Sequence, residues 1–403
     1  MIRFKKVFLL IICLLIITMV SGCWDRRELN ELAIIMAAGV DITDEGKIEL
    51  TLQLARPLAF TAGAPAGGAL VQKTTWVISG AGDTIYDAQN KIGSEVARQQ
   101  YWSHCMLMVF SQEVASTKLL EVLNFIYRFP EPRETMSIFV APGKAKDILN
   151  SNSAIESTSA QSLFYTSRSK KSFRVEFAAF TRDFYTPGTN AAAPRVEELN
   201  AGKLLGTGTE KPPEHSELAI TGTALFKADK FAGYLNPRET YGMSWLKGKT
   251  LRRARLTAPG LKDKNKKIAF EAIRNHASID PVYEGGKIKF FTRIVVEGNI
   301  AEQQGEENLL DLENIEKLQE SIAGVISEQV REALNKAKDE YGTDVFGFGE
   351  AFRRKYKKEW VKYAKNWDEK FSESEIYLDV DVKIRNTGKQ TTRPLLQKGD
   401  QRS

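Results

Sequence analysis

Apolar and polar residues alternate with a period of two in several short runs of the first half of the chain. Every second position is apolar between residues 47 and 54, and residues 33–42 form a nearly continuous apolar run before it. An Asp-Glu-Gly sequence at 44–46 separates the two runs. A period of two is typical of a strand with one buried face, and such a polar, glycine-containing interval favours a turn. These residues therefore predict a β-hairpin.

The rest of the first half combines short apolar runs with helical patterns, which predicts a mixed α/β region. Strands are predicted at 76–79, 106–110 and 136–140. Helices are predicted at 83–98, with Asp83 as N-cap, at 114–129 and at 144–149, and further helical pieces are predicted within 157–185. Residues 59–68 are rich in Ala, Gly and Pro, which favours a loop.

The second half contains longer elements. A hairpin is predicted at 218–235, a short helix at 237–246, extended segments at 251–257, 268–279 and 287–298, a basic helix at 348–365 and a strand at 376–385. A long amphipathic helix is predicted at 309–341, because apolar residues recur there with a helical period. These residues are Ile315, Leu318, Ile322, Val325, Ile326 and Val330.

Residues 186–213 are dense in Gly, Pro, Ala and Thr, which predicts the main connection between domains. We expect an N-terminal mixed α/β domain at 23–200, a linker at 201–216, a C-terminal domain at 217–392 and a tail at 393–403. In an alternative division, the hairpin and helix at 217–250 form a separate middle domain. Strands and helices occur in groups, so the sequence predicts a multi-domain α+β protein with mixed or antiparallel sheets rather than a doubly wound sheet.

The first 25 residues have the order of a secretory signal. Positive charge at the start is followed by an apolar run at 7–20 and by Val20-Ser21-Gly22-Cys23, the pattern of a bacterial lipobox. The apolar run has about 14 residues and spans ~21 Å as a helix, whereas a bilayer core of about 30 Å needs ~20 residues. We therefore expect residues 1–22 to be a cleaved signal peptide rather than a membrane span.

Cys23 is then the site of lipid attachment. The sequence predicts an S-diacylglycerol cysteine at this position, which can also carry an N-acyl chain. Two acyl chains anchor a protein stably, whereas one chain holds it marginally. We expect the remaining chain to be tethered outside the cytoplasmic membrane.

Composition adds little evidence for another function. The 403-residue chain has a formal net charge of +6, a mild excess that does not favour binding to nucleic acid. Of its three cysteines, Cys13 leaves with the signal, Cys23 is acylated and Cys105 lies in an apolar run that predicts a buried, inert thiol.

No catalytic, cofactor-binding or metal site is predicted. His104, His215 and His276 are far apart in sequence, and no pair has the spacing of metal ligands. Ser244 does not lie in a complete nucleophile elbow, and the glycine-rich sequence at Gly206 lacks the ending of a phosphate loop. The sequence therefore predicts a protein that is not an enzyme.

The basic stretches at 247–267 and 353–362 permit two interpretations. In the first, the cations form a solvated helix face whose aromatic residues pack on a sheet. These aromatic residues are Phe352, Tyr356, Trp360 and Tyr363. In the second, the cations contact anionic headgroups or an acidic partner.

Eight short sequences distributed along the chain form a recognisable set. They are Gly22-Cys-Trp-Asp-Arg-Arg-Glu-Leu, Ala37-Ala-Gly-Val-Asp, Ile220-Thr-Gly-Thr-Ala-Leu-Phe, Gly233-Tyr-Leu, Gly242-Met-Ser-Trp-Leu-Lys-Gly, Asp344-Val-Phe-Gly-Phe-Gly-Glu, Lys358-Glu-Trp and Asn366-Trp-Asp-Glu-Lys-Phe. This set resembles the sequences of the Ger(x)C lipoproteins, the C subunits of spore germinant receptors. The resemblance covers nearly the whole chain, in order.

The resemblance implies a non-enzymatic, anchored subunit on the outer surface of the spore inner membrane. Its partners would be the polytopic A and B subunits of a nutrient receptor, and Cys23 is the site residue that carries over. No nucleic acid, cofactor or specific small-molecule ligand is implied. Two other classes stay open from the residues alone: a solute-binding lipoprotein of a transporter and a cell-wall hydrolase.

Overall fold

The computed structural model describes residues 4–6, 8, 28–56, 74–151, 156–168, 173–200, 216–248, 254–305, 308, 309 and 311–388. Cys23, the predicted loop at 59–68, His215, almost all of the expected linker and the expected tail lie outside these ranges. Within the described ranges, no helix has both the length and the apolar composition needed to cross a bilayer.

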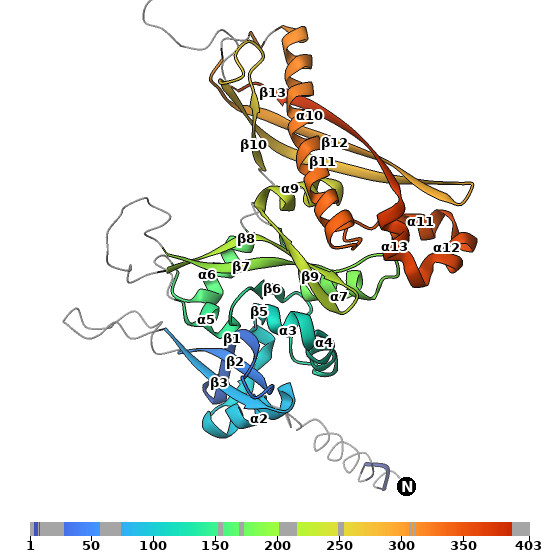
Figure 1. The fold of residues 1–403 in the computed structure, drawn as a ribbon. Coiled ribbons are helices and arrows are strands. Elements are labelled where there is room, and N and C mark those ends of the chain that lie inside the picture. The colour runs from blue at the N-terminus through green and yellow to red at the C-terminus, as the bar shows by residue number, and fades with distance from the viewer. Residues whose placement is uncertain are drawn as a thin grey trace, which may run out of the picture.

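The described residues contain a nine-stranded mixed sheet and a four-stranded sheet (Figure 1). The larger sheet has the order β3-β2-β1-β5-β6-β7-β8-β9, and β4 pairs with β1. Its strands are β1 (Leu32–Ile42), β2 (Ile48–Ala55), β3 (Thr75–Gly82), β4 (Gln99–Tyr101), β5 (Leu107–Ser111), β6 (Ser137–Ala141), β7 (Ala192–Asn200), β8 (Ser216–Lys227) and β9 (Lys230–Leu235). Neighbours from β1 through β5 and β6 to β7 run parallel, whereas the pairs on either side are antiparallel.

The predicted hairpin is confirmed as β1 and β2, which pair antiparallel around a turn containing Gly46 at φ 78°. The other predicted strands of the first half are also present as β3, β5 and β6. The prediction of a connection at 186–213 was wrong in part, because β7 lies inside it and pairs with both β6 and β8. Residues 186–213 are rich in glycine and poor in apolar residues, so their sequence does not predict a strand. The stability of β7 comes from its two neighbouring strands.

Helices lie on both faces of the larger sheet. They are α2 (Ile85–Glu95), α3 (Gln112–Thr117), α4 (Leu119–Arg128), α5 (Ala145–Asn150), α6 (Ser159–Arg168) and α7 (Phe177–Tyr185). Met108 and Phe110 of β5 belong to the cluster that contains α3 and α4, whereas Leu107 and Val109 pack with α5 and α6. Alternate residues of a strand point to opposite faces, so β5 contributes to two cores.

Two predicted helices differ in detail. The N-cap of α2 is Thr84, whose side chain accepts from Asp87 N, and Asp83 lies one residue before it. The helix predicted at 114–129 is two helices, because Lys118 leaves the helical conformation between α3 and α4. Leu119, Val122, Leu123 and Ile126 are all buried in α4.

The smaller sheet has the order β10-β11-β12-β13. Its strands are β10 (Arg255–Pro259), β11 (Lys267–Glu284), β12 (Lys287–Gln303) and β13 (Glu375–Asn386). β11 and β12 form a long antiparallel hairpin, and β13 pairs parallel to β12. The predicted extended segments are therefore present, but β11 and β12 continue well beyond the predicted limits.

The long helix α10 (Leu312–Leu334) packs against β13 and β10 of the smaller sheet, as Figure 1 shows. Leu318, Ile322, Ile326 and Val330 are buried, so the predicted apolar face is confirmed. A π-helical turn at Asn335–Glu340 continues the helix to nearly the predicted end.

The remaining helices lie between the two sheets or beside the smaller one (Figure 1). They are α9 (Pro237–Leu246), α11 (Phe348–Lys355), α12 (Lys357–Tyr363) and α13 (Trp367–Glu373). The predicted helix at 237–246 is confirmed as α9, whereas the basic helix predicted at 348–365 is broken at Tyr356. The whole is α+β, with two sheets packed with helices and a long helix in the C-terminal half.

Candidate functional site

The stretches that carry the family resemblance in the second half of the chain meet where the two sheets meet. β8, β9 and α9 come from residues 216–246, and the segment 344–350 leads into α11 beside them (Figure 1). We call this region the junction and define it by Asp183, Gly188, Asn190, Lys247 and residues 344–350.

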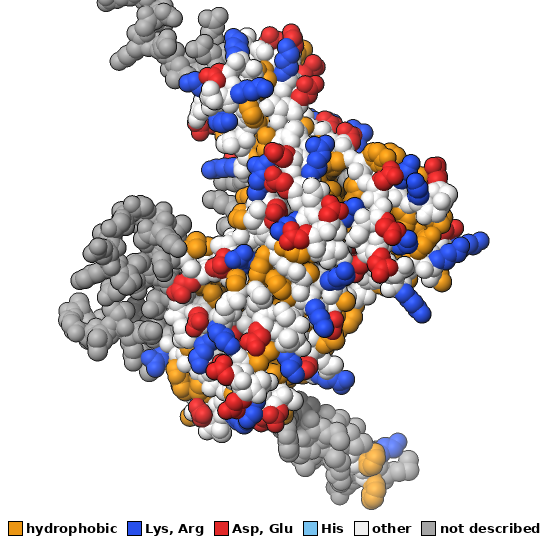
Figure 2. All heavy atoms as spheres, in the orientation of Figure 1, with side chains coloured by type: hydrophobic (Ala, Val, Ile, Leu, Met, Phe, Trp, Pro, Cys, Tyr) orange, Lys and Arg blue, Asp and Glu red, His pale blue; other side chains and the backbone are white. Residues whose placement is uncertain are grey.

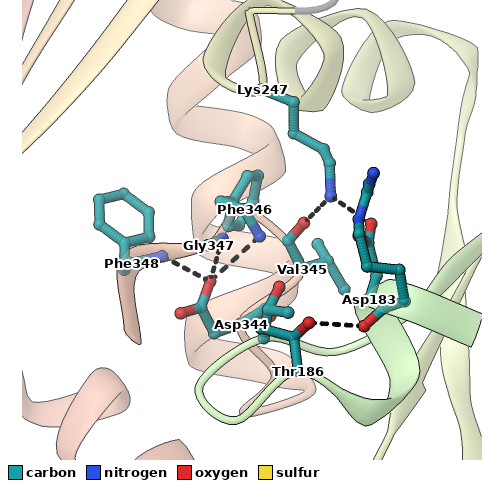
Figure 3. Close-up of polar contacts among 10 residues, drawn as sticks. Asp183, Thr186, Lys247, Asp344, Val345, Phe346, Gly347 and Phe348 are labelled. Atoms are coloured by element: carbon teal, nitrogen blue, oxygen red, sulfur yellow. Dashed lines mark hydrogen bonds and ion pairs between the residues drawn. The ribbon is translucent and has the colours of Figure 1, made fainter. Parts of the chain in front are cut away.

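The carboxylate of Asp344 is the polar centre of the junction. Its Oδ1 accepts from the backbone N–H groups of Phe346, Gly347 and Phe348 at 3.0, 2.9 and 3.2 Å, as Figure 3 shows. Its Oδ2 accepts from Gly349 N at 2.7 Å and from Trp367 Nε1 at 3.1 Å. The carboxylate thereby satisfies N–H groups at the start of α11 that have no partner within the helix.

Glycine permits this tight turn. Gly347 immediately precedes α11 with φ 95°, in the left-handed region that glycine adopts at little cost. Asp344 is fully buried, and this burial raises the pKa of its carboxyl group, while the hydrogen bonds from Gly349, Gly347, Trp367 and Phe348 act in the opposite direction. With five donors directed at it, the carboxylate has no accessible lone pair for a substrate, which excludes a role as general base.

The backbone of the same turn is bonded to the larger sheet. Asn190 N, just before β7, donates to the carbonyl oxygen of Asp344 at 2.7 Å, and Glu350 N donates to that of Gly188 at 3.1 Å. The backbones of Gly188 and Gly349 are in direct contact, because a Cβ on Gly188 would lie 2.7 Å from the carbonyl carbon of Gly349. The connection between the two halves therefore depends on glycine at both positions.

Lys247 forms a second connection across the junction. Its Nζ donates to the carbonyl oxygen of Val345 and lies 3.4 Å from Asp183 Oδ2, and only 9% of the lysine side chain is exposed (Figure 3). These three residues come from the end of α9, from the turn before α11 and from α7. One ammonium group thus joins three elements.

A third contact joins α9 to α10. Gly242 lies so close to the backbone of α10 that a Cβ would overlap the carbonyl oxygen of Gln329. Trp245 Nε1 donates to Gln329 Oε1 at 2.9 Å, in a buried hydrogen bond. Gly233 of β9 is covered in the same way by the ring of Tyr341, whose hydroxyl donates to Tyr234 O at 3.3 Å. Gly242 and Gly233 therefore mark points where another segment lies directly against the backbone.

Two family models match the chain. The one described as "Spore germination protein N-terminal domain" matches residues 25–198, and the one described as "Spore germination B3/ GerAC like, C-terminal" matches residues 221–388. This chain belongs to the GerAC-like family of spore germination proteins. The two models leave 199–220 between them, yet β7 and β8 pair on either side of this interval, so the larger sheet includes strands from both matched regions.

Curated relatives match along nearly their whole length. Spore germination protein YndF of Bacillus subtilis (strain 168) is 28% identical over 94% of this chain and 96% of its own. Spore germination protein KC of the same organism is 26% identical over 95% and 96%, and spore germination protein B3 is 23% identical over 96% and 98%. The crystal structure of the GerBC protein aligns with a TM-score of 0.52 at 20% identity, covering 90% of this chain and 100% of that one, which shows a shared fold.

The residues singled out from sequence are dispersed in the GerAC-like fold. His104 and His276 are both exposed: His104 lies just before β5 of the larger sheet, and His276 lies in β11 of the smaller sheet. Ser244 is buried in α9, where its hydroxyl donates to Thr240 O at 2.9 Å. Among the described residues, no three His, Cys, Asp or Glu side chains form a group that could hold a metal ion.

The buried thiol of Cys105 is confirmed, and desolvation raises its pKa to about 12. Cys23, the predicted site of acylation, lies outside the described residues.

The aromatic residues of the basic stretch pack on the sheet, as the first interpretation predicted. Tyr283, near the tip of the β11–β12 hairpin, has its ring 6.0 Å from those of Phe352 and Tyr356 and 6.1 Å from that of Tyr363, between centroids. Its hydroxyl is 3.0 Å from that of Tyr363. Figure 2 shows positive and negative side chains interspersed over the visible face, so this face has no continuous basic surface of the kind that binds nucleic acid.

Sequence reasoning did not identify Asp344 as the centre of the junction. The available signal was an Asp followed by Val-Phe-Gly-Phe-Gly, since Asp favours bonding to backbone N–H groups that follow it and glycine permits the turn. The partners Asn190, just before β7, and Trp367 of α13 have no such local signal.

Proposed function

We propose that this protein is the lipid-anchored C subunit of a spore germinant receptor, that it is not an enzyme, and that it acts by contact with polytopic A and B subunits. The observation that carries the proposal is the match to spore germination proteins over nearly the full length of this chain and of each relative.

The polar groups of the junction support a role in protein–protein contact rather than catalysis. The buried carboxylate of Asp344 is bonded to five N–H donors, and the buried ammonium of Lys247 is bonded to Asp183 and Val345. Such groups fix the relative position of the two sheets. A fixed arrangement is what a subunit needs to present one surface to a partner.

The anchor keeps the folded part close to the bilayer. Cys23 precedes the start of β1 at Leu32 by nine residues, which span at most about 30 Å when extended. Under this proposal the protein lies on the outer surface of the spore inner membrane. Confinement to the membrane raises the effective concentration of the partner subunits, so that contacts too weak for free association are sufficient.

The test is the Cys23→Ala variant, expressed in spores in place of the natural chain. We expect the variant to leave the membrane fraction and nutrient-triggered germination to be lost, because the acyl chains are absent. Cys13→Ala is the matched control: it makes the same chemical change within the apolar run of the signal, and it should leave both properties intact.

A Cys23→Ala protein that stays in the membrane fraction and supports normal germination would overturn the anchoring proposal. Affinity capture from detergent extracts tests the partner proposal separately. If the Cys13→Ala protein is anchored but captures no polytopic partner, the proposed contact with A and B subunits is wrong while the anchor stands.

A further inference from the structure

A pocket lies at the amino ends of the parallel strands β5 and β6. Its volume of about 410 Å³ lies within the range of small-ligand sites. Residues 103–106, before β5, and Arg133, Thr135 and Met136, before β6, line one part of it. The last turn of α6 and the segment before α7 supply the rest, including Phe164, Arg168, Arg174 and Glu176.

The charges of the pocket are predominantly positive. Three arginines, Arg133, Arg168 and Arg174, line it together with one glutamate, Glu176, which leaves an excess of two positive charges. Arg174 Nη2 is paired with Glu176 Oε1 at 2.5 Å. The Nε of Arg174 is buried and has no hydrogen-bond partner within the described residues. The guanidinium groups therefore have donor capacity that Glu176 does not use.

The rest of the lining is mixed: Ser103, His104 and Thr135 are polar, whereas Cys105, Met106, Met136 and Phe164 are apolar. The guanidinium of Arg168 lies 5.1 Å from the ring centroid of Phe164, and Met106 and Met136 line the pocket with the buried Cys105. Planar guanidinium groups bind phosphate and carboxylate oxygens through paired N–H donors. Apolar side chains beside them suit a ligand whose anionic group is attached to an apolar body.

We propose that this pocket binds a phosphate group carried on an apolar body, the chemistry of an anionic phospholipid headgroup. β1 runs parallel to β5, so the amino ends of both strands lie toward the same edge of the sheet. The chain enters β1 at that edge, nine residues after Cys23. The pocket is therefore on the side of the domain from which the lipid anchor extends. The inference that the phosphate belongs to a membrane lipid rests on the proposed anchor. The inference that the pocket binds a phosphate rests on the pocket alone.

Thermal unfolding of the purified full-length protein in non-ionic detergent micelles tests the proposal. Ligands that bind the folded state alone raise the midpoint of unfolding. The three additions are phosphatidylglycerol in the micelles, phosphatidylcholine at the same mole fraction, and inorganic phosphate against sodium chloride at equal ionic strength. We expect phosphatidylglycerol to raise the midpoint in a saturable manner and phosphatidylcholine to leave it unchanged. A response to inorganic phosphate as well identifies a site that also accepts the free anion.

Three variants assign the effect to the pocket. Arg168→Gln and Arg174→Gln should each weaken binding about tenfold, the effect of losing one charge-assisted hydrogen bond. Glu176→Gln should strengthen binding several-fold, because it removes the competing carboxylate beside Arg174, a direction that a purely structural role does not predict. Arg255→Gln makes the same change of charge on β10 of the other sheet and should bind as the natural protein does.

The proposal is overturned if neither phosphatidylglycerol nor phosphate raises the midpoint above its matched control, or if all four variants respond alike. This outcome would leave the acylation of Cys23 untouched, because detergent micelles do not require the anchor and its test is the membrane fraction of spores.

Discussion

Gly242 of α9 lies directly against the backbone carbonyl of Gln329 of α10. A Cβ at Gly242 would overlap that oxygen and would also lie 3.0 Å from the Cβ of Ala333. Gln329 additionally accepts from the indole N–H of Trp245 through its side chain. The two helices therefore cross at a distance that only a residue without a side chain permits, which explains a glycine inside a helix.

We expect Gly242→Ala to lower the free energy of unfolding by about 1–3 kcal/mol, the usual cost of forcing atoms into a packed site. Gly324→Ala is the matched control. Gly324 is in the middle of α10, and a Cβ there would meet no atom within 4 Å. The control should stabilise the protein by roughly 0.5–1 kcal/mol, because alanine favours helix over glycine. Urea unfolding followed by tryptophan fluorescence measures the free energy of unfolding of both variants. If both substitutions changed it in the same direction, this account of the helix crossing would be wrong.

Asp344→Asn tests the turn that begins α11. An amide group offers one acceptor oxygen in place of two and places an NH₂ group against buried N–H donors. Each buried donor left unsatisfied costs about 1–3 kcal/mol, so we expect a clear loss of stability in urea unfolding. Asp339→Asn is the control, since its side chain is 59% exposed and bonded to Lys338. Equal stability of the two variants would show that the N–H groups at the start of α11 find other partners.

Lys247→Met tests the ammonium group that joins three elements. Methionine preserves much of the side-chain volume but leaves the Asp183 carboxylate and the Val345 carbonyl without this donor. Breaking one partner of a buried polar contact costs about 1–3 kcal/mol. The control Lys317→Met removes a highly exposed pair with Glu313, which contributes little because water screens it. The interpretation is wrong if the two substitutions cost the same in thermal unfolding.

Cys105 should resist alkylation in the folded protein. Burial raises the pKa of its thiol to about 12, so the thiolate that reacts with iodoacetamide is scarce at neutral and mildly alkaline pH. At about pH 9 an ordinary cysteine with a pKa near 8.5 is largely thiolate, whereas Cys105 stays almost entirely protonated, so its alkylation should be far slower than that of an ordinary cysteine at about pH 7 and at about pH 9. Mass spectrometry of the peptide that contains Cys105 measures the modification, with the protein in urea as positive control. Rapid labelling without urea would show that the site opens.

Local sequence patterns were sufficient to predict an element and its buried face where the element has a regular apolar period. Alternation in residues 47–54 predicted β2. The spacing of Leu318, Ile322, Ile326 and Val330 predicted the buried face of α10. In each case the period of the apolar residues equals the period of the element, so the pattern determines both the element and its buried side.

Local patterns did not predict which strands pair when the two strands are distant in sequence. β7 is stabilised by pairing with β6 and β8. Nothing in residues 192–200 themselves indicates these neighbours, so the sequence predicts a connection there. The parallel pairing of β13 with β12 likewise joins segments separated by α10 and three further helices. Strand pairing is a property of two segments, and alternation within one of them cannot specify the other.

The sequence by itself predicted the amphipathic elements and the family to which the chain belongs, and it is the source of the proposal that Cys23 is acylated after a signal peptide. The tertiary structure decided which polar groups act together. It placed Asp344 under five donors, brought Lys247 to Asp183 across the junction, and gathered Arg133, Arg168 and Arg174 around one pocket. The physical reason is that a period of two or of 3.6 records only which side of an element is buried. The partners of a buried charge depend on how separate elements pack, and that packing brings together residues with no relation in sequence.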